Sequence, residues 1–210
     1  ENAQSWFLST DTAVAALWRI NTSSPMPQRI CLAQIELPLS CVKATAQTWQ
    51  ELETLDRPLV LELSSRERFA GSAVLLEMQE SVALLQLEQG VEAVSLAELG
   101  PYWTGGYQFF WHPPAGFSSP LSRGDNSVAV AEVARMFAQL DNQQQRLTDS
   151  LFNKALETRV VMFQQQHGLK ADGVVGVKTL LQLNELLGID VTRSAATAAT
   201  GASLPTGFRP

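Results

Sequence analysis

The chain has 210 residues, of which 45% are hydrophobic and 17% charged, and its formal net charge is −6. This length allows one or two domains, and the apolar fraction is sufficient for a folded core. Nucleic acids and anionic lipids attract clustered Lys and Arg, whereas only four residues are Lys and no basic run occurs. We therefore exclude both as partners. Because there is no apolar stretch of ~20 residues and no signal peptide at the start, we expect a soluble part of a longer protein.

The first half of the chain is predicted to contain helices followed by strands. Apolar residues recur at helical spacing over residues 12–20, with Asp11 or Thr10 available as the N-cap. A second short helix is predicted over residues 29–36, and residues 48–51 form the capping-box pattern Thr-x-x-Glu. Strands are predicted over residues 59–63, 73–78, 82–87 and 107–111. Helices first and antiparallel strands afterwards indicate an α+β domain.

The two cysteines, Cys31 and Cys41, flank a segment that contains Pro38. In one continuous helix they would lie ~15 Å apart, too far for a disulfide. Proline interrupts a helix and lets the chain fold back, so a disulfide is feasible. It would stabilise the fold by roughly 2.5–3 kcal/mol in the chain-entropy model and would indicate an oxidising compartment. The alternative is a pair of buried free thiols that behave as small apolar residues.

Two changes in composition divide the chain. Residues 111–120 are rich in Pro, Gly and Ser, which is typical of a segment between domains. Residues 191–207 are mostly Ala, Thr, Ser and Gly without apolar periodicity, so they are predicted to be flexible or to fold only on a partner. We therefore predict domains over residues 1–116 and 117–190, followed by a tail over residues 191–210.

Three short helices are predicted in the second domain. Apolar stripes at helical spacing begin at Val130, Leu156 and Leu180, and Gly168 and Gly188 follow the second and third helices. The links between the helices are short, which indicates a compact all-α bundle.

A loop-into-helix element occurs twice in this bundle. Residues 149–153 lead into the second helix and residues 172–176 into the third. Each element begins with Asp, ends with Asn or Gly and has an apolar residue between them. An Asp side chain accepts backbone N–H groups in such turns, and Gly or Asn tolerates positive φ.

These two elements and the segments 122–125, 160–164 and 167–169 resemble the three-helix peptidoglycan-binding domain attached to many cell-wall enzymes. The sequence departs from the family at Ser150 and Asn153, where glycine is usual, and at Leu156, where Thr is frequent. Most motif residues are expected to build the fold. The resemblance implies candidate contacts to sugar or stem peptide at Asp149, Arg159, Gln164 and Asp172. A solvated helix face is the alternative role of these polar residues.

No cofactor and no metal site is predicted. The segment 173–179 differs from a nucleotide-binding P-loop, because only two residues separate its glycines and Val177 precedes Lys178. The two Cys and two His residues match no zinc-ligand spacing.

The first domain resembles, in the order of its segments, the papain-like cysteine peptidases that trim bacteriocin leaders. The segments that carry this resemblance are 11–17, 48–52, 57–61, 73–76, 94–99 and 102–105. Such an enzyme needs a thiolate at a helix N-terminus, a His base and an acid that orients the His. The nucleophile position falls on Thr12, and no His lies near residues 71–73. The acid position falls near residues 88–89, and Gln4 corresponds to the oxyanion-hole glutamine.

This resemblance therefore implies a papain-like fold with no catalytic residues. The enzymatic alternative is a wall-targeted cysteine peptidase or hydrolase. It would have to use Cys31 or Cys41 together with His112.

The two resemblances in this order are similar to the periplasmic region of the general secretion pathway A protein of type II secretion, in which the segment from Cys31 to Cys41 has a counterpart. This implies a non-catalytic periplasmic scaffold, part of a protein anchored in the inner membrane, that holds the secretion complex on the cell wall and assists secretin assembly. The implied partners are peptidoglycan, the companion B protein and, indirectly, the secretin. A protein-interaction module without glycan affinity is the other alternative, and a homo-oligomer stays open.

Overall fold

The computed structural model describes residues 5–27, 30–31 and 39–201. Contacts divide the chain into two compact units, the first formed by Glu1–Trp111 with Val191–Pro210 and the second by His112–Asp190. In sequence, the second unit is therefore inserted into the first, and it begins a few residues before the predicted boundary at residue 116. Among the described residues, no helix has the length and hydropathy that a membrane span requires.

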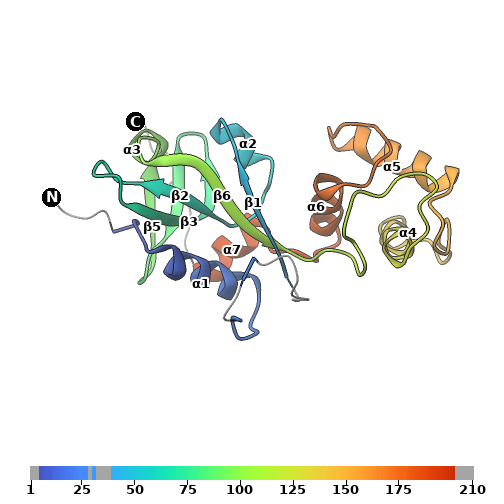
Figure 1. The fold of residues 1–210 in the computed structure, drawn as a ribbon, viewed down its shortest axis with the longest axis horizontal. Coiled ribbons are helices and arrows are strands. Elements are labelled where there is room, and N and C mark those ends of the chain that lie inside the picture. Colours follow the sequence, from blue (N-terminus) through green and yellow to red (C-terminus); the bar gives the residue numbers. More distant parts are fainter. Residues whose placement is uncertain (1–4, 28–29, 32–38, 202–210) are drawn as a thin grey trace. The chain divides into compact units, whose positions relative to one another are not determined.

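A six-stranded antiparallel sheet forms the body of the first unit (Figure 1). Its strands are β1 (Ser40–Thr45), β2 (Leu59–Ser64), β3 (Ala70–Gln79), β4 (Val82–Gln86), β5 (Val91–Ser95) and β6 (Trp103–Trp111). Their order in the sheet is β1-β6-β2-β3-β4-β5, so the last strand of the chain lies between the first two. Every neighbouring pair is antiparallel. The predicted α+β class is confirmed.

The four predicted strands correspond to β2, β3, β4 and β6, and β3 with β4 forms a hairpin. The two strands that the pattern missed, β1 and β5, are the edge strands of the sheet. Most of their residues are half-buried or exposed. An edge strand therefore has no continuous apolar run by which it could be found.

Four helices accompany the sheet: α1 (Thr10–Asn21), α2 (Trp49–Glu53), α3 (Leu96–Leu99) and α7 (Arg193–Thr200). The hydroxyl of Ser9 accepts the N–H of Thr12 and caps α1. The predicted caps, Asp11 and Thr10, lie inside the helix instead. The helix predicted over residues 29–36 falls almost entirely outside the described residues.

The capping box at the start of α2 is confirmed. The Thr48 hydroxyl accepts the N–H of Glu51 at 3.3 Å, and the Glu51 carboxylate accepts the N–H of Gln47 at 3.1 Å. Two of the backbone donors at this helix start are therefore satisfied by side chains.

The core of the first unit lies between the sheet and two helices, α1 and α7, which both contact β3. Its buried members include Leu17 and Trp18 from α1, Val74 from β3, Phe110 from β6 and Ala196 from α7. The rings of Trp18 and Phe110 meet edge to face with centroids 5.3 Å apart. Helices far apart in sequence thus bury the same face of the sheet.

The segment predicted as a flexible tail contributes α7 to this core, so that prediction is wrong for Arg193–Thr200. Thr192 caps the helix, and Arg193, Ala196 and Thr197 are buried. The Arg193 guanidinium donates a hydrogen bond to the carbonyl of Leu52. Alanine has the highest helix propensity and a side chain small enough for close packing on a sheet. A helix of this composition forms without the large apolar residues on which periodicity depends.

The second unit is the predicted three-helix bundle. Its helices are α4 (Val128–Leu140), α5 (Lys154–Gln166) and α6 (Val177–Leu186). Phe137 of α4 and Phe163 of α5 meet edge to face with centroids 5.4 Å apart, and both are fully buried. Phe152, which precedes α5, is also buried. The apolar stripes predicted from the sequence therefore form the core of the bundle.

Candidate functional site

The turn before α6 is built around Asp172. Its Oδ1 accepts the N–H of Val174 at 3.0 Å, as the sequence predicts. Gly173 follows with a φ of +73°. A Cβ at this glycine would lie 3.2 Å from Cγ of Glu157 in α5. The turn therefore needs glycine for its conformation and for its close approach to α5.

Gln164 connects this turn to α5. Its amide nitrogen donates to Asp172 Oδ1 at 3.2 Å, to the carbonyl of Val174 at 2.9 Å and to Thr179 Oγ1 at 3.2 Å. Its amide oxygen accepts the N–H of Gly173 at 2.9 Å. The side chain is buried and its hydrogen-bonding groups face the turn. Gln164 and Asp172, two of the predicted site residues, are therefore in contact. Gln164 supports the turn from below, and Asp172 is exposed at the surface.

The turn before α5 is built differently. The side chain of Asp149 is 97% exposed, and its one contact is with Arg146 at 3.4 Å. It accepts no backbone N–H among the described residues. Asp125 has such a bond in its own turn, where its Oδ2 accepts the N–H of Ser122 at 2.7 Å, and its backbone carbonyl accepts the N–H of Phe152 at 2.7 Å. The prediction that Asp149 organises its turn is wrong, but its side chain is free to face a ligand.

Asn153 shows why glycine is not required at the end of this turn. Its φ of −88° is open to any residue, and its Oδ1 accepts the N–H of Leu156 at 2.9 Å as the N-cap of α5. Its Nδ2 also donates to the carbonyl of Leu147 at 2.9 Å. By comparison, Gly176 at the start of α6 provides no side-chain cap. This departure from the family pattern adds hydrogen bonds to the turn.

A single segment, residues 121–127, pairs with both turns. Leu121 pairs with Val175 of the second turn through two backbone hydrogen bonds of 3.0 and 2.8 Å. Asn126 forms a bridge with Leu151 of the first turn. The two turns are therefore fixed relative to each other by backbone pairing within the second unit.

Arg159 joins α5 to the end of α4. Its Nε and Nη2 donate to the two carboxylate oxygens of Asp141 at 2.7 and 2.6 Å. The guanidinium also lies over the rings of Phe137 and Phe163, 4.9 and 5.9 Å from their centroids. Such a forked ion pair on an aromatic base fixes the side chain. Arg159 therefore supports the bundle, and only 17% of its side chain is exposed.

Charged side chains that the sequence analysis did not select gather beside Asp172. Glu157 forms ion pairs with Lys154 at 2.7 Å and with Arg123 at 3.8 Å. Lys170 pairs with Asp172 at 3.3 Å. Because Gly173 packs on Glu157, these five residues (Arg123, Lys154, Glu157, Lys170 and Asp172) form one group, the charged cluster. The i, i+3 spacing of Lys154 and Glu157 in a predicted helix was the one feature of the sequence that could have indicated this ion pair.

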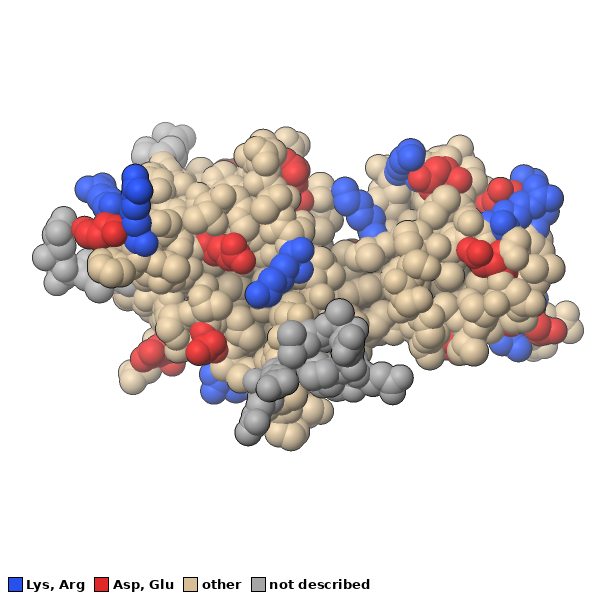
Figure 2. Space-filling model, viewed as in Figure 1, with Lys and Arg blue, Asp and Glu red and all other residues tan. Residues whose placement is uncertain are grey.

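The charged cluster contains charges of both signs. In the view of Figure 2, basic and acidic side chains lie beside one another and form no patch of one sign. The hydrogen bond from Lys154, followed by the charges of Lys154 and Arg123, holds the pKa of Glu157 below its usual value. The lowered pKa favours the charged form of Glu157, and the cluster presents both cationic and anionic side chains to carboxylates and amines.

Asp172 should make the second unit sensitive to acid. The hydrogen bond from Val174, followed by contacts with Lys170 and Gln164, lowers the pKa of Asp172 from 3.8. A carboxyl with a lowered folded-state pKa adds stability above its unfolded pKa, and this stability is lost as the pH falls through the folded pKa. We expect Asp172→Asn to lose less thermal stability than the wild type between pH 7 and about pH 3, measured by circular dichroism. The matched control Asp149→Asn should follow the wild type, and equal losses in all three proteins would contradict the prediction.

In the first unit, the residues at the peptidase positions include no acid–base pair. Thr12 lies in the first turn of α1, where its hydroxyl is 2.8 Å from that of Ser9. At the position of the base, Ser72 of β3 is buried and its hydroxyl is 3.2 Å from that of Thr10. Glu88 is exposed in the turn between β4 and β5. The predicted oxyanion-hole residue Gln4 lies outside the described residues.

Thr12 and Glu88 do share an open groove of about 730 Å³ on the first unit. Its walls come from α1, from the turn after β4 and from α7, which contributes Ala195 and Ala199. Arg19 is the only basic residue among those that line it. The groove is thus mainly apolar and holds no nucleophile with a base.

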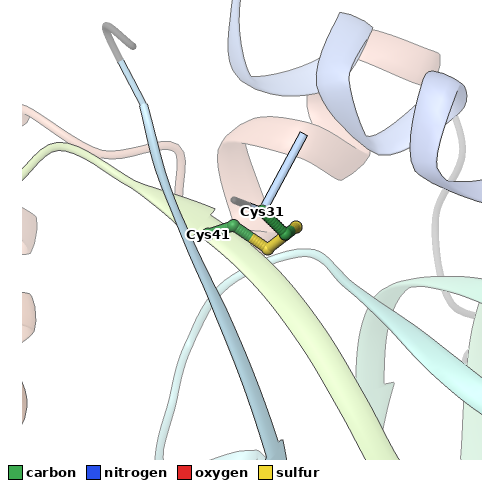
Figure 3. The surroundings of a disulfide bond; sticks show 2 residues. All are labelled: Cys31 and Cys41. Carbon is green, nitrogen blue, oxygen red and sulfur yellow. A yellow bond between two sulfur atoms is a disulfide. The ribbon is translucent and has the colours of Figure 1, made fainter. Parts of the chain in front are cut away.

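The predicted disulfide is present (Figure 3). Cys31 and Cys41 are bonded with their Cα atoms 5.0 Å apart. Cys41 belongs to the edge strand β1, and both residues pack against the core around α1. Since these are the only two cysteines of the chain, it contains no free thiol. The disulfide removes the nucleophile that the cysteine-peptidase alternative requires.

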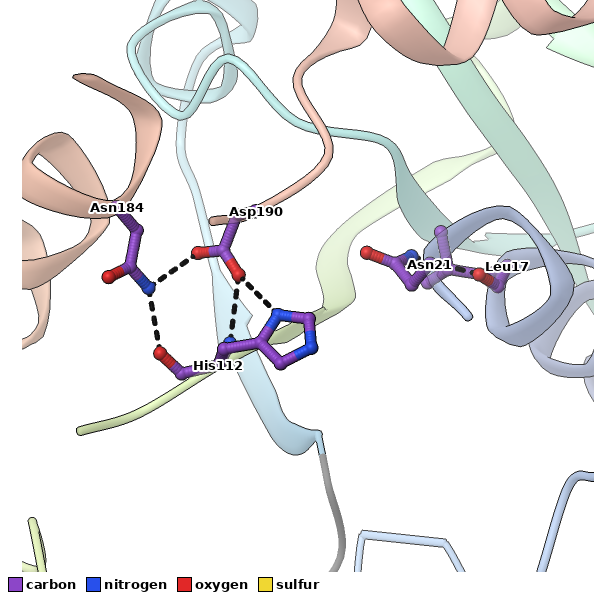
Figure 4. Close-up of polar contacts among 5 residues, drawn as sticks. All are labelled: Leu17, Asn21, His112, Asn184 and Asp190. Atoms are coloured by element: carbon purple, nitrogen blue, oxygen red, sulfur yellow. Dashed lines mark hydrogen bonds and ion pairs between the residues drawn. The ribbon is translucent and has the colours of Figure 1, made fainter. Parts of the chain in front are cut away.

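His112 is also engaged (Figure 4). Its backbone N–H donates to Asp190 Oδ1 at 2.8 Å, and its Nδ1 lies 2.9 Å from the same oxygen. Asn184 donates to the carbonyl of His112 at 2.7 Å and to Asp190 Oδ2 at 2.9 Å. These bonds join the first and last residues of the second unit. His112 thus closes the bundle, and no group of metal-binding side chains occurs in the described parts of the chain.

Comparisons with known proteins agree with this arrangement. Residues 126–183 match the family described as "Putative peptidoglycan binding domain". The chain is 24% identical over 204 residues to general secretion pathway protein A of Aeromonas hydrophila, which covers 92% of this chain. The chain spans 36% of the length of that relative.

A solved structure has the same fold. It is a periplasmic domain of the EpsAB fusion protein of the Vibrio vulnificus type II secretion system, with a TM-score of 0.67 and 22% identity. The similarity covers 100% of this chain and 92% of that one. Most of the second unit is therefore similar to the putative peptidoglycan-binding family, and the chain resembles the periplasmic region of the general secretion pathway A protein over nearly its whole length.

Proposed function

We propose that this chain is a non-catalytic, peptidoglycan-binding scaffold of the periplasm that anchors a type II secretion complex to the cell wall and assists secretin assembly. The observation that carries the proposal is the family match over residues 126–183, which includes both turns and most of the three helices. The similarity to a secretion pathway A protein along 92% of the chain supports the secretion role. The disulfide suits an oxidising compartment such as the periplasm.

The first unit is, in this proposal, a papain-like fold that has lost its catalytic site. The absence of a thiol and the hydroxyl side chains of Thr12 and Ser72 at the nucleophile and base positions support it. A hydroxyl group is a weak nucleophile unless a neighbouring base removes its proton, and neither Thr12 nor Ser72 can act as that base.

Peptidoglycan binding is assigned here to the charged cluster and to Asp149. Stem peptides carry carboxylates and amines, which the ion-paired residues of the cluster can receive by exchanging partners. Asp149 is exposed beside the first turn and can accept hydrogen bonds from sugar hydroxyls. Arg159 and Gln164 act indirectly, because their side chains hold α4, α5 and the second turn in place.

The proposed partners besides peptidoglycan are the companion B protein and, through the assembled complex, the secretin. The protein would be anchored in the inner membrane outside this segment, and a homo-oligomer is compatible with this role. A protein-interaction module is the second candidate function. The apolar groove of about 730 Å³ on the first unit favours it, since such grooves receive protein segments.

Co-sedimentation with purified sacculi tests the proposal. We expect the whole chain to pellet with sacculi at physiological salt, and Lys154→Glu to reduce the bound fraction at least five-fold. Arg135→Glu is the matched control, because Arg135 also forms an exposed i, i+3 ion pair, with Glu132, but lies outside the charged cluster. If the wild type stays in the supernatant, the anchoring role fails and the interaction module becomes the leading function. If both variants bind like the wild type, the charged cluster is not the binding surface.

A further inference from the structure

A small pocket with polar, charged and apolar residues in its lining lies on the first unit, far in sequence from the peptidoglycan-binding match. Its volume is about 250 Å³, and it is located at the N-terminal end of α1 on the sheet face that this helix covers. The polar residues that line it are Thr10, Lys43, Glu62, Ser64, Arg68, Ser72, Thr104 and Gln108. They belong to α1, to four strands of the sheet and to the connections between elements. The proposed function gives a role to none of them, and only Ser72 lies at a position that is catalytic in the peptidases.

Gln108 is the first indication of a ligand. Gln108 is only 3% exposed. It lies in the centre of β6, where its backbone pairs with Lys43 of β1 and Val60 of β2. Within the described residues, no group forms a hydrogen bond with the Gln108 amide, which opens onto the pocket. Gln164 in the second unit, by contrast, has partners for both ends of its amide. The Gln108 amide therefore obtains its hydrogen bonds from whatever occupies the pocket, and a ligand that both accepts and donates hydrogen bonds would satisfy it.

The charges around the pocket favour an anion. Lys43 and Arg68 are basic and Glu62 is acidic, which leaves one net positive charge on the lining. None of the three forms an ion pair with any part of the chain that the structure describes. The pocket also faces the start of α1, a helix of 12 residues whose N-terminus is the positive end of its dipole. Asp11 in that first turn is exposed and does not line the pocket.

Arg68 is held in position by its turn. Its N–H donates to the carbonyl of Ser65 at 2.9 Å, and Ser65 and Phe69 exchange a second backbone hydrogen bond of 2.9 Å. The Ser65 hydroxyl accepts the N–H of Phe69 at 3.1 Å. The backbone that carries this cation is thus part of a hydrogen-bonded turn, which limits the backbone entropy lost on binding.

The size of the pocket limits the ligand. A volume of about 250 Å³ equals that of roughly eight water molecules in the liquid. Drug-sized ligands fill larger cavities, so this one suits a group of one or two small residues. A glycan chain would not fit.

We propose that this pocket binds the free carboxyl end of a peptidoglycan stem peptide, an inference that rests on the proposed function. Lys43, Arg68 and the α1 N-terminus receive the terminal carboxylate, and the Gln108 amide pairs with the last peptide group. Stem peptides end in alanine, whose methyl group suits a small pocket, and they carry an amine that can pair with Glu62. The first unit would then bind the end of the stem peptide, while the second unit binds the peptidoglycan polymer.

Isothermal titration calorimetry on the whole chain tests the proposal, with a synthetic stem pentapeptide ending in D-Ala-D-Ala as the probe. We expect binding, and at least ten-fold weaker binding of the same peptide with a C-terminal amide. Gln108→Leu should weaken binding at least ten-fold while its unfolding temperature stays equal or rises, because the amide that it removes forms no hydrogen bond with the described residues. Arg68→Glu, on the exposed hairpin, should also weaken binding ten-fold, whereas the neighbouring Arg66→Glu should not.

Three results would overturn the inference. The first is no binding of the pentapeptide by a chain that still pellets with sacculi, which leaves the proposed function intact. The second is equal binding of a pentapeptide ending in L-Ala-L-Ala, which would assign the pocket to a protein C-terminus. The third is unchanged binding by Gln108→Leu and Arg68→Glu. If neither the pentapeptide nor sacculi bind, the inference and the proposed function fail together.

Discussion

Replacing Gln164 with leucine should lower the free energy of unfolding of the second unit by about 3 kcal/mol. Leucine has a similar volume but cannot accept from Gly173 or donate to Val174 and Thr179. These groups would be left in a buried environment without partners, and each orphaned group costs about 1–3 kcal/mol. The loss should exceed that of an ordinary surface change, because water cannot replace the missing bonds.

The position of the tryptophans allows the stability of the second unit to be measured separately from that of the first. All five lie at residues 6, 18, 49, 103 and 111, in the first unit. Tryptophan fluorescence therefore follows the first unit, while circular dichroism at 222 nm also follows the helices of the second. Gln164→Leu should shift the circular dichroism transition in urea and leave the fluorescence transition in place.

Gln165→Leu is the matched control, since it makes the same chemical change at the next, exposed residue of α5. It should change the stability by no more than about 0.5 kcal/mol. Sacculi binding should decline in Gln164→Leu at temperatures where the second turn is disordered. A loss no greater than that of the control would mean that Gln164 does not support the turn.

The bundle was predicted well because its signals are local. Helical stripes, the glycine at residue 173 and the Asp172 turn each depend on residues within a few positions of one another. The role of Gln164 was also readable, because it stands four residues after Val160 on the buried stripe of α5. Its polar character suggested a surface contact, whereas its position indicates a buried support.

Other features depend on contacts that no local pattern records. Arg159 of α5 and its partner Asp141, the residue that follows α4, are 18 positions apart. Gln108 reaches its buried position because β6 lies between β1 and β2, which requires pairing of distant segments. Residues Arg193–Thr200 form a helix that packs against β3, a contact that is distant in sequence. Sequence periodicity therefore predicts elements, while their partners follow from the tertiary fold.

The second large effect concerns the disulfide. Replacing both Cys31 and Cys41 with serine should lower the free energy of unfolding of the first unit by about 2.7 kcal/mol, the loop-closure entropy of a separation of 10 residues. The bond restrains the unfolded chain, and in the folded protein it ties the edge strand β1 to the core around Trp18. Because an edge strand is paired on one side only, it has few other restraints.

Urea unfolding followed by tryptophan fluorescence measures this loss. Adding reductant should lower the wild type to the level of the double serine variant and should not affect that variant. The circular dichroism change that belongs to the second unit should stay in place, which is the reverse of the pattern expected for Gln164→Leu. If reductant leaves the wild-type fluorescence transition unchanged, the cysteines are not bonded in the folded protein. An oxidising compartment would then have no support from the structure, and the secretion role would depend on the similarity to known secretion proteins alone.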